Sequence, residues 1–170
     1  MPDDRENSPI QVQARNLLRG GMFGSILVAA SGRAETPVAV QTPEGRLHSW
    51  FVPVTVGNQL AGYFQFLPDL TVMGYSSFQR KDDSLNGCPV AESWTDPDTI
   101  RGLAGTLAGP GETAGTPYLT YDRAPSRLAW GVPLTSPAGT KRTVLVAGQA
   151  VWESPSPDVD IDSYGGRRPR

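Results

Sequence analysis

The only histidine and the only cysteine of the chain are the residues best suited to nucleophilic or acid–base chemistry. His48 lies two residues before Trp50, and Cys88 follows an Asn-Gly turn signal in the segment NGCPV. A catalytic histidine needs a second group that orients its ring, and a reactive thiol needs a positive environment or a helix N-terminus. No such group is evident in the sequence next to either residue. We therefore expect His48 to be a partly exposed strand residue and Cys88 to be structural.

Three aspartates near the C-terminus have the spacing of the first ligands of a calcium-binding loop, at Asp158, Asp160 and Asp162. Ser163 stands where such a loop has its glycine, and Pro169 stands where it has its bidentate glutamate. A solvated acidic tail is the simpler interpretation. A single cysteine and a single histidine also exclude a multi-Cys or multi-His metal site. The sequence predicts neither a metal nor a cofactor.

Other short motifs lack the spacing that their chemistry requires. The segment Gly20–Gly24 matches neither the dinucleotide-binding nor the phosphate-loop pattern, and no nucleophile elbow surrounds Ser76 and Ser77. We expect Asp122, in the segment YDR, to cap a turn. Catalysis would need His48 to converge with an acid such as Asp122. The sequence therefore predicts a protein that is not an enzyme.

The composition limits the classes of partner. The 170 residues are 38% hydrophobic with a net charge of −2, and Gly (19) with Pro (16) predicts many turns and few long helices. The absence of a basic surplus argues against nucleic acid. No apolar run approaches the roughly 20 residues that cross a bilayer, so we expect no membrane insertion. The acidic head is unlike a secretory signal, which favours the cytoplasm and leaves secretion after processing open.

Hydrophobic periodicity predicts an α+β fold in the order helix, strands, helix, strands. The first helix is expected at Ile10–Leu18, before Gly20-Gly21, and the second between Asp96 as cap and Gly109 as stop. Whether Phe23–Ala30 is helix or strand stays open. In the long strand near Trp50, alternate residues are expected to share one face. Strands are expected at 37–41, 47–56, 60–67, 70–78, 117–121, 127–135 and 142–152.

The segments WFVPVT and WGVPLT, Trp50–Thr55 and Trp130–Thr135, lie eighty positions apart. Residues 36–55 laid over 116–135 give six identities in twenty. Self-similarity at a fixed distance indicates one structural unit used twice, although shared β-strand vocabulary is the alternative. We interpret the chain as two tandem αβββ(β) units with antiparallel sheets, each covered by a short helix. Pro53 and Pro133 cannot donate a ladder hydrogen bond, so we expect each on an edge strand or at a bulge.

The second copy resembles the propeptide modules of secreted zinc metalloproteases, the PepSY-like family. Pro117, Leu119 and Tyr121 match its first strand element; Arg127–Trp130 with Val132 match its second. Val144, Leu145 and Val146 match its third, and the likeness covers residues 116–153. Ala147 stands where that family has an acidic residue. The resemblance implies a cystatin-like α+β module whose three strands form an antiparallel meander.

These patterns divide the chain into five segments, with both units in one compact domain. Whether the sheets of the two units pair or pack face to face stays open. The segments are a head at 1–9, a first unit at 10–79, a connecting loop at 80–95, a second unit at 96–152 and a tail at 153–170.

Aromatic residues in the predicted strands are the remaining functional signal, because exposed aromatics on a sheet are typical anchors for a protein partner. We expect a non-catalytic protein-binding module or accessory subunit, for example an inhibitor or chaperone-like domain, that uses a sheet face or edge and its tails. The alternative is a module that binds a small ligand between sheet and helix, in a cavity lined by Trp50 and Trp130. Homo-oligomerisation stays open. The candidate binding residues are Trp50, Tyr63, Tyr75, Tyr118, Trp130, Trp152, Arg167, Arg168 and Arg170.

Overall fold

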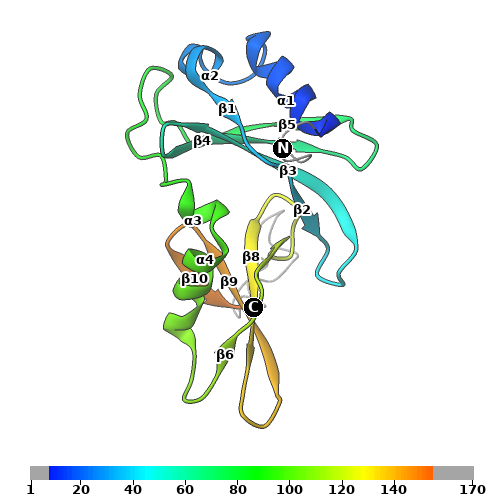
Figure 1. The fold of residues 1–170 in the computed structure, drawn as a ribbon, viewed down its shortest axis with the longest axis vertical. Coiled ribbons are helices and arrows are strands. Elements are labelled where there is room, and N and C mark those ends of the chain that lie inside the picture. Colours follow the sequence, from blue (N-terminus) through cyan, green and yellow to red (C-terminus); the bar gives the residue numbers. More distant parts are fainter. Residues whose placement is uncertain (1–7, 155–170) are drawn as a thin grey trace, which may run out of the picture. The chain divides into compact units, whose positions relative to one another are not determined.

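A computed structural model of the chain describes residues 8–154 (Figure 1). Short helices and antiparallel strands make up these residues, so the predicted α+β class is confirmed. The chain divides into two compact units, and the boundary falls between Asp96 and Pro97. Each unit builds its own antiparallel ladders, and we describe them separately.

Two helices open the first unit, α1 (Pro9–Arg19) and α2 (Ile26–Ser31). Ser8 caps α1, since its Oγ accepts a hydrogen bond from Gln11 N at 3.2 Å, and the helix ends at Gly20 as the sequence predicts. The open question over Phe23–Ala30 is answered by α2, whose cap Ser25 accepts from Val28 N. A local side-chain cap therefore fixes the start of both helices.

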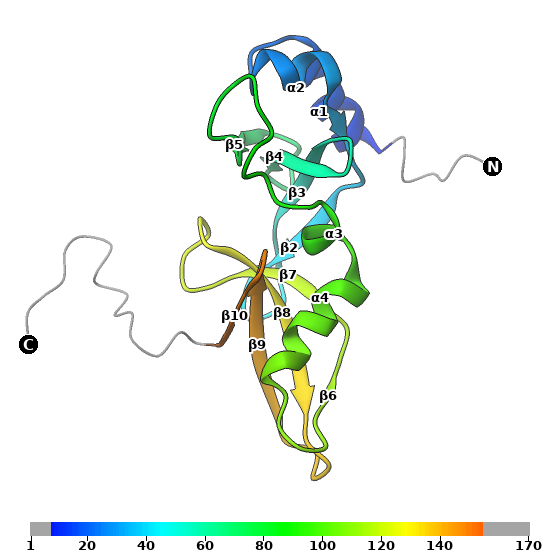
Figure 2. The same cartoon turned by 90° about the vertical axis from the view of Figure 1, so that its left-hand side faces the viewer.

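The first sheet is centred on its longest strand, β3. One side of β3 pairs with β1 and then β2, the other side pairs with β4, and β5 pairs with β4. The helices cover one face of these strands (Figure 2). Val52 and Val54 are buried in this core, and Trp50 and Val56 pack against it, so the predicted common face is confirmed. The strands are β1 (Arg33–Ala34), β2 (Val38–Gln41), β3 (Leu47–Val56), β4 (Gln59–Phe66) and β5 (Val72–Ser77).

The opposite face of the same strands also carries aromatic rings. The ring of Phe51, fully buried, lies 4.8 Å from the ring of Tyr63 and 6.2 Å from that of Trp94, measured between centroids. Trp94 belongs to α3 (Glu92–Thr95), a short helix that the sequence patterns miss. Because successive strand side chains alternate between faces, Phe51 and Val52 belong to different packed layers. Both faces of the first sheet therefore contribute to packing.

The second unit repeats the strand plan with a different helix. Its helix α4 packs along β8 and β9 (Figure 2). The helix predicted up to Gly109 ends earlier, at Ala104, and continues as a 3-10 turn. The strand expected at 142–152 is a hairpin of two strands that turns at Gly148 (φ 60°). The elements are α4 (Pro97–Ala104), η1 (Gly105–Leu107), β6 (Thr113–Ala114), β7 (Tyr118–Tyr121), β8 (Leu128–Thr135), β9 (Lys141–Ala147) and β10 (Ala150–Glu153).

The ladders of the two units have the same register at an offset of eighty residues, except at their ends, where Gln41 pairs with Leu47 and Thr55 with Leu60 in the first unit. In each unit a two-residue strand and a four-residue strand pair with one side of the long strand, and the next strand pairs with the other. The repeat is therefore present in the backbone pairing of the strands as well as in the amino-acid sequence. The matching pairs are Arg33 with Thr55 and Thr113 with Thr135, Ala39 with Trp50 and Leu119 with Trp130, and Pro53 with Tyr63 and Pro133 with Thr143.

The two repeated prolines lie in inner strands rather than at an edge, and each faces an irregular part of the ladder, where three residues of the neighbouring strand oppose two of the long strand. Glu35 N donates to Pro53 O at 2.8 Å, and Gly115 N donates to Pro133 O at 2.8 Å. The return bond cannot form since proline has no N–H. The neighbouring strand therefore ends at Ala34 in the first unit and Ala114 in the second, and pairing resumes after a break of three residues. Each proline is accommodated by a break in its partner strand.

Candidate functional site

The candidate aromatic residues of the first unit are distributed over both faces of its sheet. Trp50 and Tyr75 pack against the core beneath the helices, where the ring of Tyr75 lies 5.0 Å from that of Phe64. Tyr63 lies on the other face, 5.8 Å from the ring of Phe78. The structure thus brings Trp50 and Tyr75 into one packed layer and places Tyr63 in another.

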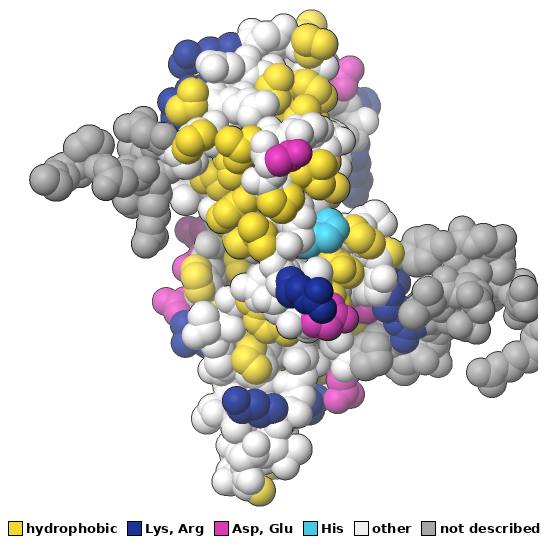
Figure 3. All heavy atoms as spheres, turned by 90° about the vertical axis from the view of Figure 1, so that its right-hand side faces the viewer, with side chains coloured by type: hydrophobic (Ala, Val, Ile, Leu, Met, Phe, Trp, Pro, Cys, Tyr) yellow, Lys and Arg dark blue, Asp and Glu magenta, His cyan; other side chains and the backbone are white. Residues whose placement is uncertain are grey.

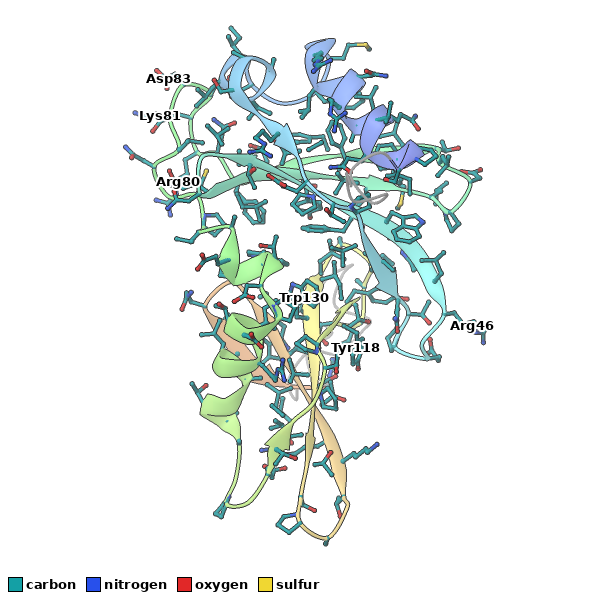
Figure 4. All side chains as sticks on the ribbon, viewed as in Figure 1. Arg46, Arg80, Lys81, Asp83, Tyr118 and Trp130 are labelled. Carbon is teal, nitrogen blue, oxygen red and sulfur yellow. The ribbon has the colours of Figure 1, made fainter. Side chains whose placement is uncertain are left out.

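In the second unit, the three candidate aromatics have separate structural contacts. Trp130 is 6% exposed, and Tyr118 covers Gly131 on the adjacent strand (Figure 4). Trp152 Nε1 donates to Asp122 Oδ2 at 3.1 Å. The candidate arginines Arg167, Arg168 and Arg170 and the aspartates at 158–162 lie outside the described residues.

Asp122 has a larger role than the turn cap expected from sequence. Its carboxylate is 2% exposed and lies 3.2 Å from Arg127 Nη2, in addition to its bond from Trp152. Two donors thus compensate the desolvation of this charge. The contact joins the turn before β8 to the last strand of the unit. Local sequence could not indicate it, because Trp152 is thirty residues away.

His48 and Cys88, whose residue types are capable of catalysis, lie in environments that do not activate them. His48 is half-buried, and its Nδ1 lies 2.9 Å from Ser49 Oγ. Cys88 is a buried free cysteine, and burial raises the pKa of its thiol, which disfavours the thiolate. Across residues 8–154 no group of three His, Cys, Asp or Glu side chains could hold a metal ion. None of the helices in the described part of the chain is long and apolar enough to cross a membrane.

The turn between β4 and β5 carries the most unusual backbone of the first unit. Leu70 has φ 73°, in the left-handed region that favours glycine. Two backbone bonds hold the turn, Leu67 N to Thr71 O at 2.8 Å and Leu70 N to Leu67 O at 2.9 Å. Asp69 Oδ1 accepts from Thr71 N at 2.9 Å, and this bond lowers the pKa of the Asp69 carboxyl, which stays ionised at neutral pH. The turn is therefore well defined although its leucine is strained.

This turn also exposes large apolar side chains. Leu67 is 39% exposed, Leu70 36% and Met73 46%. Figure 3 shows hydrophobic side chains gathered on the face of the first unit that carries this turn, with an acidic side chain among them. We call Leu67, Leu70 and Met73, together with Asp69, the hairpin surface. The sequence does not indicate this surface, because Pro68-Asp69 predicts only a turn and the backbone conformation of Leu70 cannot be inferred from its residue type.

The hairpin surface has no counterpart in the described part of the second unit, residues 97–154. There the equivalent turn between β9 and β10 contains only Gly148 and Gln149, with glycine in the left-handed position. The turn at 67–71 therefore has five residues where the turn between β9 and β10 has two.

A second difference between the units is the loop that follows β5. Gln79 organises it, because its Nε2 lies 3.2–3.4 Å from the carbonyl oxygens of Lys81, Asp82 and Ser84, and its Oε1 accepts from Ser25 Oγ at 2.8 Å. Arg80, Lys81 and Asp83 point outward from the loop (Figure 4). A shallow polar pocket of about 420 Å³ lies here, lined by Arg80, Lys81, Asp83, Ser84, Asn86 and Gly87.

The chain matches no protein-family model, no curated protein and no solved structure. An antiparallel meander is common to many folds, so the PepSY-like resemblance of residues 116–153 stays a prediction.

Proposed function

We propose that this chain is a non-catalytic protein-binding module and that the hairpin surface of the first unit contacts its partner. The observation that carries the proposal is the strained, exposed Leu70 between the exposed side chains of Leu67 and Met73. We also propose that the two units derive from one duplicated αβββ(β) unit, which the shared register supports. In a duplicated protein, features that one copy alone carries are the best candidates for a specific function.

The conformation of Leu70 has an energetic cost that folding does not require. A left-handed backbone costs a non-glycine residue about 1–2 kcal/mol, and Gly or Asn would reduce that cost. The side chain is 36% exposed and lies outside the buried core of the unit, so its packing is incomplete in the isolated chain. Contact with a partner would offset part of this cost: full burial of a leucine is worth about 1.5–3 kcal/mol, and the exposed third of the Leu70 side chain would recover a corresponding share.

The chemistry of the hairpin surface defines the partner. Three apolar side chains around a turn fit a hydrophobic groove, and exposed apolar patches on soluble proteins mark interaction sites. Asp69 remains ionised at the apex, so a lysine or arginine at the edge of the groove would complement it. We therefore propose a partner protein with an apolar groove bordered by a cation.

The substitution Leu70→Asn tests the proposal. It removes the strain and the apolar contact together, so the isolated protein becomes more stable while partner binding weakens by at least tenfold. Leu107→Asn is the matched control, because Leu107 is 40% exposed in the second unit. Photo-crosslinking from position 70 in native extract identifies the partner, and purified components then give the affinity.

The outcomes separate the alternatives. Crosslinks from position 70 to one protein, absent from position 107 and lost on competition with unlabelled wild-type chain, support the proposal. Crosslinks only to a second copy of the chain, with concentration-dependent self-association in sedimentation, would show that the surface forms a homodimer and would refute a separate partner protein. Equal affinity of the Leu70→Asn variant and the wild type for the purified partner would refute the assigned surface.

A further inference from the structure

The first unit contains a polar pocket of about 340 Å³ at the junction of α1, α2 and β1, the elements at one end of the unit in Figure 1. This volume is in the range of small-ligand sites. The end of α2 contributes small residues, so the pocket is not filled from that side. Its lining includes Gln11, Arg15, Arg19, Arg33 and Glu35, together with the small Ala29, Ala30 and Gly32.

The charged groups of the pocket are predominantly basic. Arg15 and Arg19 lie one helical turn apart on α1, so they face the same side, and Arg33 comes from β1. Glu35 is the acidic residue of the lining, and its Oε1 accepts from Thr55 Oγ1 at 2.7 Å. Arg33 Nε lies 4.0 Å from Glu35 Oε1, a weak contact for a side chain that is 79% exposed. Three arginines and one glutamate give the lining a net charge of +2.

A buried amide in the wall of the pocket has an unused acceptor. Gln11 is 5% exposed, and its Nε2 donates to Ala34 O at 3.0 Å. Because a carbonyl oxygen only accepts, this bond fixes the orientation of the amide. Gln11 Oε1 has no hydrogen-bond partner among the described residues. A buried acceptor without a donor costs about 1–3 kcal/mol. The oxygen has almost no accessible surface, so a ligand hydroxyl would recover this cost once side chains of the pocket wall move to expose it.

We infer that this pocket binds a small phosphate monoester whose hydroxyl group donates to Gln11 Oε1. A phosphate monoester carries about −1.5 to −2 charges at pH 7, which complements the lining. Guanidinium groups bind phosphate oxygens through paired N–H donors, and two of the three come from one rigid helix face. The inference is independent of the hairpin surface, which involves other residues of the first unit.

Titration of the full-length chain tests the site with three probes: glycerol 3-phosphate, methyl phosphate and glycerol. We expect glycerol 3-phosphate to produce saturable amide shifts in residues 11–19 and 29–36 of the ¹H–¹⁵N spectrum, and glycerol to produce none. Arg19→Gln and Arg33→Gln should each weaken binding about tenfold, since each removes a charged hydrogen-bond donor. Arg46→Gln is the matched control, because Arg46 is an exposed arginine outside the pocket (Figure 4).

The hydroxyl contact has its own test. Methyl phosphate has the charge of the ester but no hydroxyl group, so wild type should bind it several-fold more weakly than glycerol 3-phosphate. Gln11→Met keeps the side-chain volume and removes the acceptor, and it should abolish that difference. Equal affinity of the wild type for the two esters would overturn the role of Gln11, even if the variant fails to fold. Equal weakening by Arg46→Gln and Arg19→Gln, or no saturable shift in the pocket segments, would overturn the site.

Discussion

Tyr118 occupies the space where Gly131 would carry a side chain. The two residues are directly opposite on β7 and β8, and a Cβ built on Gly131 would lie 2.6 Å from Tyr118 Cζ. The first unit has a related pair, because the hydroxyl end of Tyr75 on β5 lies over Gly62 on β4. In each unit a tyrosine covers a glycine of an inner strand and restores the packing that the glycine lacks.

The tyrosine–glycine contact predicts a non-additive pair of substitutions. Gly131→Ala should lower the free energy of unfolding by about 1–3 kcal/mol, because the ring must move. In a Tyr118→Ala background the same substitution should cost much less, which urea denaturation measures as a coupling energy. Gly102→Ala is the control. Nothing lies within 4 Å of its added Cβ, and alanine in α4 should stabilise by about 0.5–1 kcal/mol. Additive costs at 118 and 131 would contradict the contact.

Tyr75 predicts a loss of stability in alkali. Burial raises the pKa of its phenol to about 12, and its hydroxyl has no hydrogen-bond partner among residues 8–154. The unfolded phenol ionises near pH 10, so its contribution is present below pH 10 and is lost as pH rises towards 12. Tyr75→Phe should flatten this part of the stability profile and leave neutral stability unchanged or raised by about 1 kcal/mol. An unaltered alkaline slope in the variant would show that the phenol does not contribute.

The cluster around Arg142 predicts the corresponding behaviour in acid. Arg142 donates to both carboxylate oxygens of Glu112, to Glu153 Oε1 and to Leu107 O. Hydrogen bonds from Arg142, and then from the Gly109 N–H, lower the pKa of Glu112 to about 2. The folded carboxylate therefore stays charged where the unfolded one, at 4.5, takes up a proton.

Stability from Glu112 is thus present above pH 4.5 and is lost as pH falls towards 2. Glu112→Gln should reduce the acid slope of the denaturation midpoint. Glu44→Gln makes the same charge change on an exposed turn and serves as the control. If both variants retain the wild-type acid slope, the Arg142 cluster does not govern acid stability.

The loop after β5 should depend on one side chain. Gln79→Ala removes the contacts to three loop carbonyls and to Ser25, so amide hydrogen exchange at 80–88 should accelerate by about tenfold or more. Global stability should fall only slightly, because the substitution leaves the packing of Leu85 and Cys88 in place. Gln149→Ala, at the exposed turn of the second unit, is the control for the loss of an amide side chain. Unchanged exchange at 80–88 would show that backbone bonds suffice.

Local patterns predict local structure in this chain. The apolar spacing of Ile10–Leu18 before Gly20-Gly21 identifies α1, and the repeated Trp-x-Val-Pro segment identifies the long strands, because both patterns lie within a few residues. The segment of α2, ILVAAS, is apolar without a period, so its helix depends on the cap at Ser25. The pocket could not be inferred, since Arg15 and Arg33 meet only through packing. Asp122 was underestimated because one of its donors is thirty residues distant.

The prolines at 53 and 133 also disfavour non-native registers between the long strand of each unit and its short neighbour. Each is matched with a three-residue break that contains Thr-Pro, at Glu35–Pro37 and Gly115–Pro117. If the short neighbouring strand were shifted by two residues, one of its paired residues would lie opposite the proline. The carbonyl of that residue would then have no N–H donor, because proline has none, at a cost of about 1–3 kcal/mol. The native alignment avoids this cost. The proline of each repeated segment therefore disfavours a shifted strand register in its own unit.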